Sequence, residues 1–190
     1  MINFDIIVLG ASLGGLKASQ TILSALPARF STPIVIVQHR KPDSSASRTL
    51  TNLLQKSCAL PVVEAEDKMT IKRGQVYISP PDYHLLVEED HFSLSTEAPV
   101  NYARPSIDVL FESTAIAFGK HVIGVLLTGA NIDGALGLKA IRSCGGLTIV
   151  QDPKTADAVE MPFGALEVDA ADHIMPLNEI GPFLVNMCCR

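Results

Sequence analysis

Short apolar runs alternate with amphipathic segments along most of this chain. The runs that indicate buried strands cover residues 5–9, 33–38, 61–64, 121–127, 147–150 and 172–175. Helical spacing of apolar residues predicts helices over residues 14–25, 44–56, 105–118, 133–144, 161–168 and 177–189. Repeated strand–helix–strand units favour an α/β fold, with a doubly wound, mostly parallel sheet and helices on both faces.

The pattern changes between residues 74 and 96. Val76-Tyr77-Ile78 precedes the turn-forming sequence Ser79-Pro80-Pro81-Asp82, and two more short apolar runs follow before residue 96. This stretch predicts an antiparallel hairpin or meander added to the parallel sheet. The polar residues 95–104 are expected to form a loop that leads into the helix beginning at Pro105-Ser106.

The composition is typical of one acidic domain with a sizeable hydrophobic core. The 190 residues are 47% hydrophobic and carry a formal net charge of −5, so we expect a single domain over residues 1–190. No Lys/Arg-rich run suggests a nucleic-acid partner, and no apolar run approaches the ~18 residues of a membrane span. Four cysteines without a C-x-x-C pair, and an N-terminus unlike a signal peptide, favour the cytoplasm.

Three polar residues follow predicted strands directly: Ser12, His39 and Asp133. In an open parallel sheet the carboxyl ends of the strands lie along one edge, where ligands bind. We therefore expect a hydroxyl, an imidazole and a carboxylate to meet despite their separation in sequence. A nucleophile, a base and an acid in one place are the parts of a serine hydrolase.

The turn around Ser12 fits three interpretations equally well when it is considered by itself. Gly10-Ala11-Ser12-Leu13-Gly14 matches G-x-S-x-G between a strand and a helix, which is the context of a nucleophile elbow. A glycine-rich turn can also cradle a phosphate, although the spacing differs from G-x-G-x-x-G. In the third interpretation, the serine only caps the helix.

His39 and Asp133 also have simple structural interpretations. A histidine at a strand end often satisfies one hydrogen bond, and an aspartate near a helix start is favoured by the helix dipole. A catalytic role for His39 is favoured because the first two strands of such sheets are usually neighbours, so His39 and Ser12 would lie close together. The order Ser…His…Asp differs from the Ser…Asp…His order of α/β-hydrolases, so a triad here is not that superfamily's arrangement.

Several sequence blocks, in order and across nearly the whole chain, point to one family. They are Gly10-Ala11-Ser12-Leu13-Gly14-Gly15, Gln38-His39, Arg104-Pro105-Ser106-Ile107-Asp108, and Leu127-Thr128-Gly129 with Asp133-Gly134-Ala135. In these blocks the chain resembles the bacterial chemotaxis protein-glutamate methylesterases. The resemblance implies a doubly wound sheet with an inserted hairpin, as the apolar pattern does.

The resemblance also implies an activity. It suggests hydrolysis of glutamate γ-methyl esters, and deamidation of selected glutamines, on the cytoplasmic helices of chemoreceptors. Ser12 would be the nucleophile, His39 the general base and acid, and Asp133 the orienting carboxylate, with no metal or organic cofactor. Typical members carry an N-terminal receiver domain, which this chain is expected to lack, so a separate receiver protein acting in trans is a candidate partner.

The chain departs from the family pattern around the expected oxyanion site. Leu13 stands where threonine is usual, and Ala130-Asn131 stands where Met-Gly is usual, next to Gly129. Side-chain changes are tolerable if backbone amides stabilise the oxyanion, whereas asparagine in place of glycine matters if that position needs a positive φ.

Arg104 and Met161 are further candidate site residues. Arg104 is expected to hold substrate or the catalytic loop, or else to form a structural salt bridge, and Met161 to shape the cleft wall or pack. His84, His91, His121 and His173 show no metal-ligand spacing, so surface or strand-end positions are expected for them. The remaining functional alternatives are another esterase or amidase specificity, a weakly catalytic receptor-binding module, and a nucleotide-binding protein.

Overall fold

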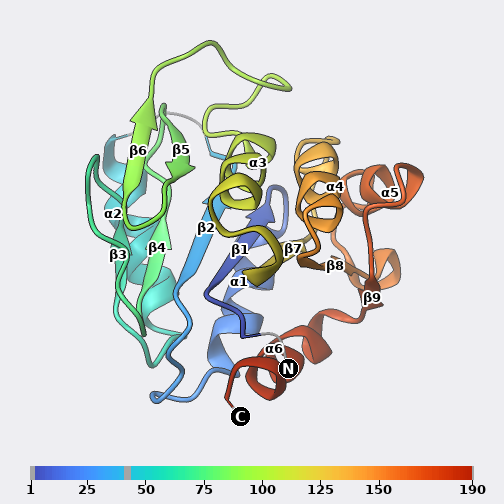
Figure 1. Cartoon of the computed structure of the whole chain (residues 1–190), viewed down its shortest axis with the longest axis horizontal. Helices are drawn as coiled ribbons and strands as arrows, with labels where there is room; N and C mark the ends of the chain where they lie inside the picture. Colours follow the sequence, from blue (N-terminus) through green and yellow to red (C-terminus); the bar gives the residue numbers. More distant parts are fainter. Residues whose placement is uncertain (1–2, 41–43, 190) are drawn as a thin grey trace.

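The computed structural model describes residues 3–40 and 44–189, with only the backbone for residues 44–49. Seven parallel strands form one sheet in the order β3-β4-β2-β1-β7-β8-β9 (Figure 1). Their bounds are β1 Ile6–Ala11, β2 Ile34–Gln38, β3 Val62–Glu64, β4 Val76–Ile78, β7 Val122–Leu126, β8 Leu147–Gln151 and β9 His173–Met175. The predicted parallel sheet is therefore confirmed.

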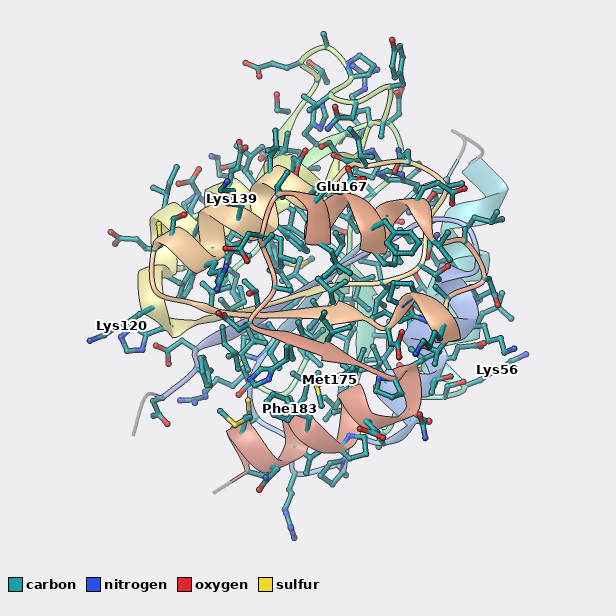
Figure 2. The ribbon with its side chains drawn as sticks, turned by 90° about the vertical axis from the view of Figure 1, so that its right-hand side faces the viewer. Lys56, Lys120, Lys139, Glu167, Met175 and Phe183 are labelled. Atoms are coloured by element: carbon teal, nitrogen blue, oxygen red, sulfur yellow. The ribbon has the colours of Figure 1, made fainter. Side chains whose placement is uncertain are left out.

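Helices cover both faces of this sheet. One face carries α1 (Gly15–Ser24), α2 (Ser44–Gln55) and α6 (Leu177–Cys188), and the other carries α3 (Ile107–Phe118), α4 (Ala135–Ser143) and α5 (Glu160–Glu167). Figure 2 shows the layers edge-on, with Met175 of β9 facing Phe183 of α6 below the sheet and α4 and α5 above it. The doubly wound architecture predicted from the sequence is confirmed. No helix in the described ranges is both long and apolar enough to cross a bilayer.

Alternation along the strands explains the two-sided core. In β1, Ile7 and Leu9 face the layer of α1 and α6, whereas Ile6 and Val8 face the layer of α3 and α4. All six residues of β1 are buried, as expected for a central strand covered on both sides. Such strands show continuous apolar runs, which is why the sequence pattern located them.

The inserted hairpin is present but shorter than predicted. β5 (His84–Val87) and β6 (Phe92–Ser95) pair antiparallel and form a separate two-stranded sheet on the α3 side. Val76–Ile78, which was expected to belong to the hairpin or meander, instead joins the parallel sheet as β4 between β2 and β3. All three residues of β4 are buried, and this is the environment of an interior parallel strand.

The strand order reverses at β1. The chain leaves β1 to form β2 on one side and later returns to form β7 on the other side. Gly10 pairs with Val37 of β2 and with Leu126 of β7. The residues that follow these three neighbouring strands therefore lie together, at the switch point where ligands bind in open α/β sheets.

Gly10 also lets the start of α3 approach the end of β1. A Cβ atom at Gly10 would lie 2.3 Å from Ile107 Cγ2, and a Cβ at Gly134 would lie 2.6 Å from the same atom. The missing side chains leave room for Ile107, which is fully buried. The first residues of α3 are thereby placed over the carboxyl edge of the sheet.

Substituting Gly10 by alanine should destabilise the fold. The added methyl group overpacks a filled site, which costs about 1–3 kcal/mol in the free energy of unfolding. Urea unfolding monitored by circular dichroism measures this loss. Lys139→Ala, an exposed position on α4 (Figure 2), should stay within about 0.5 kcal/mol of the wild type. Equal stability of both variants would show that Ile107 is not tightly fixed.

Candidate active site

Ser12, His39 and Asp133 all lie at the carboxyl edge of the sheet. The strand ladders extend into the first residues beyond the strands, because the His39 amide donates to Ala11 O at 2.9 Å and the Ser12 amide donates to Thr128 O at 3.0 Å. The Gln38 side-chain amide donates to both Ser12 O and His39 O, at 2.7 and 3.2 Å. This amide ties the loops after β1 and β2 together.

His39 and Asp133 are in direct contact. His39 Nε2 lies 2.7 Å from Asp133 Oδ2, and the two side chains are 12% and 0% exposed. Since an ionised carboxylate can only accept, Nε2 carries the hydrogen and Nδ1 is the free acceptor of the neutral ring. Across the described residues, no hydrogen bond joins the Ser12 hydroxyl to His39, which is common in sites without substrate.

The start of α3 holds the Asp133 carboxylate. Ser106 Oγ donates to Oδ1 at 2.8 Å, the Ile107 amide donates to Oδ2 at 2.6 Å, and the Asp108 amide donates to Oδ1 at 3.3 Å. Burial by itself raises the pKa of Asp133, but the hydrogen bonds from His39, Ile107 and Ser106 outweigh it and lower the pKa below its ordinary value. Asp133 is therefore held ionised although it is buried.

The simpler interpretation of Asp133 was therefore wrong. It is not a first-turn residue of the helix that follows it, because the N-cap of α4 is Gly134. Its carboxylate is satisfied by a different helix, 25 to 27 residues earlier in the chain. The positive end of the α3 dipole stabilises its charge.

His84 supports the same helix start. It is 2% exposed, its Nδ1 accepts from the Ser106 amide at 3.2 Å, and its Nε2 donates to Ala98 O at 3.1 Å. His84 opens β5, as a strand-end position predicts, but it is not at the surface. No pattern in the sequence indicates that His84 would support Ser106. Among the described residues, no group of His, Cys, Asp and Glu is arranged to hold a metal ion.

A second buried carboxylate lies beside Asp133. Asp108 is 4% exposed, and it accepts from the Gly137 amide at 2.7 Å and from Asn101 Nδ2 at 2.8 Å. The same Asn101 nitrogen donates to Asp133 Oδ1 at 3.2 Å. Burial, with a smaller contribution from the neighbouring Asp133 charge, raises the pKa of Asp108 to about 6. Sequence reasoning did not identify Asn101 or Asp108 as part of the site.

The two other interpretations of the Ser12 turn do not fit. The N-cap of α1 is Gly14, with no side-chain hydrogen bond capping the helix, so Ser12 is not its cap. Asp157 Oδ2 lies 2.6 Å from the position of a Cβ atom on Gly14. A carboxylate at that place repels the anionic phosphate that a nucleotide-binding turn would hold.

The expected oxyanion residues border Ser12. Leu13 is 61% exposed, and Ala130 is also exposed. A Cβ atom on Gly129 would lie 2.5 Å from Met161 Cε and 2.9 Å from Ser12 Cβ, so only glycine fits there. The Gly129 amide donates to Ala158 O at 3.1 Å and is not available to an oxyanion.

Asn131 and Met161 have structural roles beside this turn. Asn131 is not among the residues with a positive φ, so asparagine meets no backbone obstacle there, and its Oδ1 accepts from the Asp133 amide at 3.3 Å. Met161 is fully buried, and its amide donates to Gly129 O at 2.9 Å. Met161 therefore packs beneath the turn.

Beside His39 is a cavity of about 530 Å³. Its lining residues are His39, Arg40, Asp82, Pro99, Asn101, Tyr102, Ala103, Arg104, Pro105 and Asn131. Arg104 forms an ion pair with Asp82 at 2.7 Å and donates to the carbonyl oxygens of Thr96 and Glu97. The salt bridge expected as one alternative for Arg104 is present, and the residue also borders the cavity.

The buried Asp108 should give stability a distinct pH dependence. Its pKa is about 6 in the folded chain but about 3.9 in an unfolded chain, so between these values the folded state binds more protons. Stability therefore falls as pH rises from about 4 through 6. Asp108→Asn keeps an acceptor for Gly137 and cannot ionise. From pH 4 to 7, the wild type should lose about 2–3 kcal/mol of unfolding free energy relative to this variant.

Urea unfolding at several pH values measures this difference. The comparison with Asp108→Asn cancels the titration of the other carboxylates, which both proteins share. Parallel pH profiles for the two proteins would contradict the shifted titration of Asp108.

Comparisons with known proteins agree with this geometry. Residues 7–184 match the family model described as CheB methylesterase. A putative protein-glutamate methylesterase/protein-glutamine glutaminase of Leptospira interrogans is 47% identical over 186 residues, covering 97% of this chain and 95% of that protein. A protein-glutamate methylesterase/protein-glutamine glutaminase of Cupriavidus pinatubonensis is 43% identical, and the match covers 97% of this chain but 54% of that protein.

A solved structure shares the fold. The crystal structure of the Thermotoga maritima CheB methylesterase catalytic domain superposes with a TM-score of 0.93 and 33% sequence identity. The match covers 98% of this chain and 100% of the solved chain. The whole of the described sheet and its helices is therefore shared with that domain.

Proposed function

Because this chain belongs to the CheB methylesterase family of protein-glutamate methylesterases/protein-glutamine glutaminases, we propose that Ser12, His39 and Asp133 are its catalytic triad. The observation that carries the proposal is the 2.7 Å contact between His39 Nε2 and Asp133 Oδ2, at the edge where Ser12 follows β1. A buried carboxylate held on an imidazole next to a serine on a strand-to-helix turn fits acyl transfer.

The three residues divide the chemistry. Asp133 keeps the hydrogen on Nε2 and stabilises the imidazolium that forms during the reaction. His39 Nδ1 then accepts the Ser12 proton as Oγ attacks the ester carbonyl. The tetrahedral intermediate collapses, and the methoxy group takes that proton and leaves as methanol. Water hydrolyses the acyl-enzyme, again with His39 as the base, and releases the glutamate carboxylate.

Backbone amides are the best candidates for the oxyanion hole. In the described part of the chain, the amides of Leu13, Ala130 and Asn131 donate no hydrogen bond, and they belong to the two turns that flank Ser12. Donors of this kind stabilise the negative oxygen of the intermediate. Because the side chains take no part, leucine and alanine are compatible with this role.

The substrate would be a chemoreceptor. The names of the relatives specify protein glutamate and glutamine residues as the groups acted on, and we infer γ-methyl esters and amides on the cytoplasmic helices of methyl-accepting receptors. The enzyme would then work in the cytoplasm, with a receiver protein acting in trans as a candidate regulator. An open cavity beside His39 suits a side chain that is presented by another protein.

Removing the nucleophile should abolish turnover. Ser12→Ala is expected to lower kcat for methanol release from a methylated receptor fragment by at least 10³-fold, because triad members act as a unit. Asp133→Asn should lower kcat by about 10²–10⁴-fold, because asparagine leaves His39 in the wrong tautomer. Ser24→Ala, at an exposed position on α1, serves as the matched control and should retain wild-type activity.

The outcomes separate the functional alternatives. Methanol release that persists in Ser12→Ala would exclude Ser12 as the nucleophile. Receptor binding by the wild type without any methanol release would instead favour a receptor-binding module. Rapid cleavage of small esters without action on the receptor would favour an esterase of another specificity.

A further inference from the structure

Tyr102 occupies an unusual position on the rim of the cavity. Its side chain is fully exposed, at 104% of the reference accessibility, and it borders the same cavity as His39. Large aromatic side chains carry much apolar area, and exposed ones are enriched where proteins bind other proteins. The ring therefore contributes nothing to the packing of the hydrophobic core.

The backbone at this position is left-handed at two successive residues. Asn101 and Tyr102 have φ values of 50° and 62°, and the flanking Val100 and Ala103 exchange two backbone hydrogen bonds of 3.1 and 2.9 Å. Two successive left-handed residues form a tight turn that normally selects Asn and Gly. Asparagine tolerates this conformation, but tyrosine does so at a cost. Strain of this kind is found mainly at functional sites.

Asn101 connects this turn to the proposed triad. Its Nδ2 donates to Asp108 at 2.8 Å and to Asp133 at 3.2 Å. The turn is thereby attached to the carboxylate that contacts His39. In Figure 1 the segment between β6 and α3 extends beyond the carboxyl edge of the sheet. Tyr102 is therefore carried on a turn that is anchored to the site, and it lines the same cavity as His39 although its own side chain is in solvent.

The cavity holds more than the reacting group. Its volume is about 530 Å³, whereas the side chain of a glutamyl methyl ester has only about six non-hydrogen atoms and needs much less room. Besides His39, the cavity is lined by Pro99, Tyr102 and Arg104. It is suited to the polypeptide on either side of the ester.

We propose that Tyr102 is a substrate-binding residue that contacts the helix carrying the reacting glutamate and favours protein substrates over small esters. This inference rests on the proposed function. The ring would pack on apolar side chains and backbone next to the ester, a large contact at a small entropy cost because tyrosine has only two side-chain torsions. The turn anchored by Asn101 would hold that contact in register with His39.

The test compares two substrates in the same protein. Tyr102→Gly removes the ring and suits the left-handed backbone, so the turn and its Asn101 anchor are retained. For each variant, kcat/KM is measured for methanol release from a methylated receptor fragment and for hydrolysis of p-nitrophenyl acetate. The ratio of receptor to small-ester kcat/KM should fall about tenfold in Tyr102→Gly, mainly through KM for the receptor, as is typical when a binding hot spot is truncated.

Two further variants sharpen the result. Tyr102→Phe keeps the ring and should recover most of the ratio. Tyr83→Ala is the matched control, because Tyr83 is 41% exposed but does not line the cavity, and its ratio should equal that of the wild type.

Each contrary outcome has its own meaning. If the wild type is active on the receptor fragment and Tyr102→Gly leaves the ratio of receptor to small-ester kcat/KM unchanged, the proposed role of Tyr102 is overturned and the proposed function stays intact. Equal losses on both substrates would also overturn it, because the ring would then act on the triad and not on the receptor. A wild type that cleaves the small ester but not the receptor fragment would overturn the proposed function, and this inference with it.

Discussion

The burial of the Asp133 carboxylate is the constraint on which the site depends. A buried carboxylate without partners would protonate, and a neutral acid could not stabilise an imidazolium. Asp133 remains ionised because the start of α3, the Ser106 hydroxyl, the Asn101 amide and the His39 ring all donate to it. The close approach of Ile107 to Gly10 brings the donors at the start of α3 within reach. The chemistry of the site therefore depends on the packing of α3 against β1.

The pKa values of two neighbouring carboxylates shift in opposite directions although burial by itself raises both. Asp133 has enough donors to lower its pKa, whereas burial dominates at Asp108 and raises its pKa. Below about pH 6, Asp108 is mostly protonated, so the buried pair carries one negative charge instead of two in that range. Asn101 donates to both groups, so it attaches the turn that carries Tyr102 to both carboxylates.

The sequence predicted most of the sheet and the convergence of Ser12, His39 and Asp133 at its edge. Both follow from local signals, since continuous apolar runs mark buried strands and the parallel topology brings their ends together. The parts that were missed depend on contacts distant in sequence. Nothing in the pattern around His84, Asn101 or Ser106 shows that these side chains meet Asp133. The limits of the domain, 1–190, stay a prediction, as do the roles of the oxyanion residues.

The central claim is that Asp133 fixes the tautomer of His39, and nitrogen NMR of the histidine rings tests it most directly. The His39 signals are assigned by their absence from the spectrum of His39→Gln. In the wild type, at a pH where this ring is neutral, His39 should show a protonated Nε2 and an unprotonated Nδ1. The Nε2 proton should lose its strong hydrogen-bond shift in Asp133→Ala. A protonated Nδ1 in the neutral ring, or a His39 signal that Asp133→Ala leaves unchanged, would contradict the account.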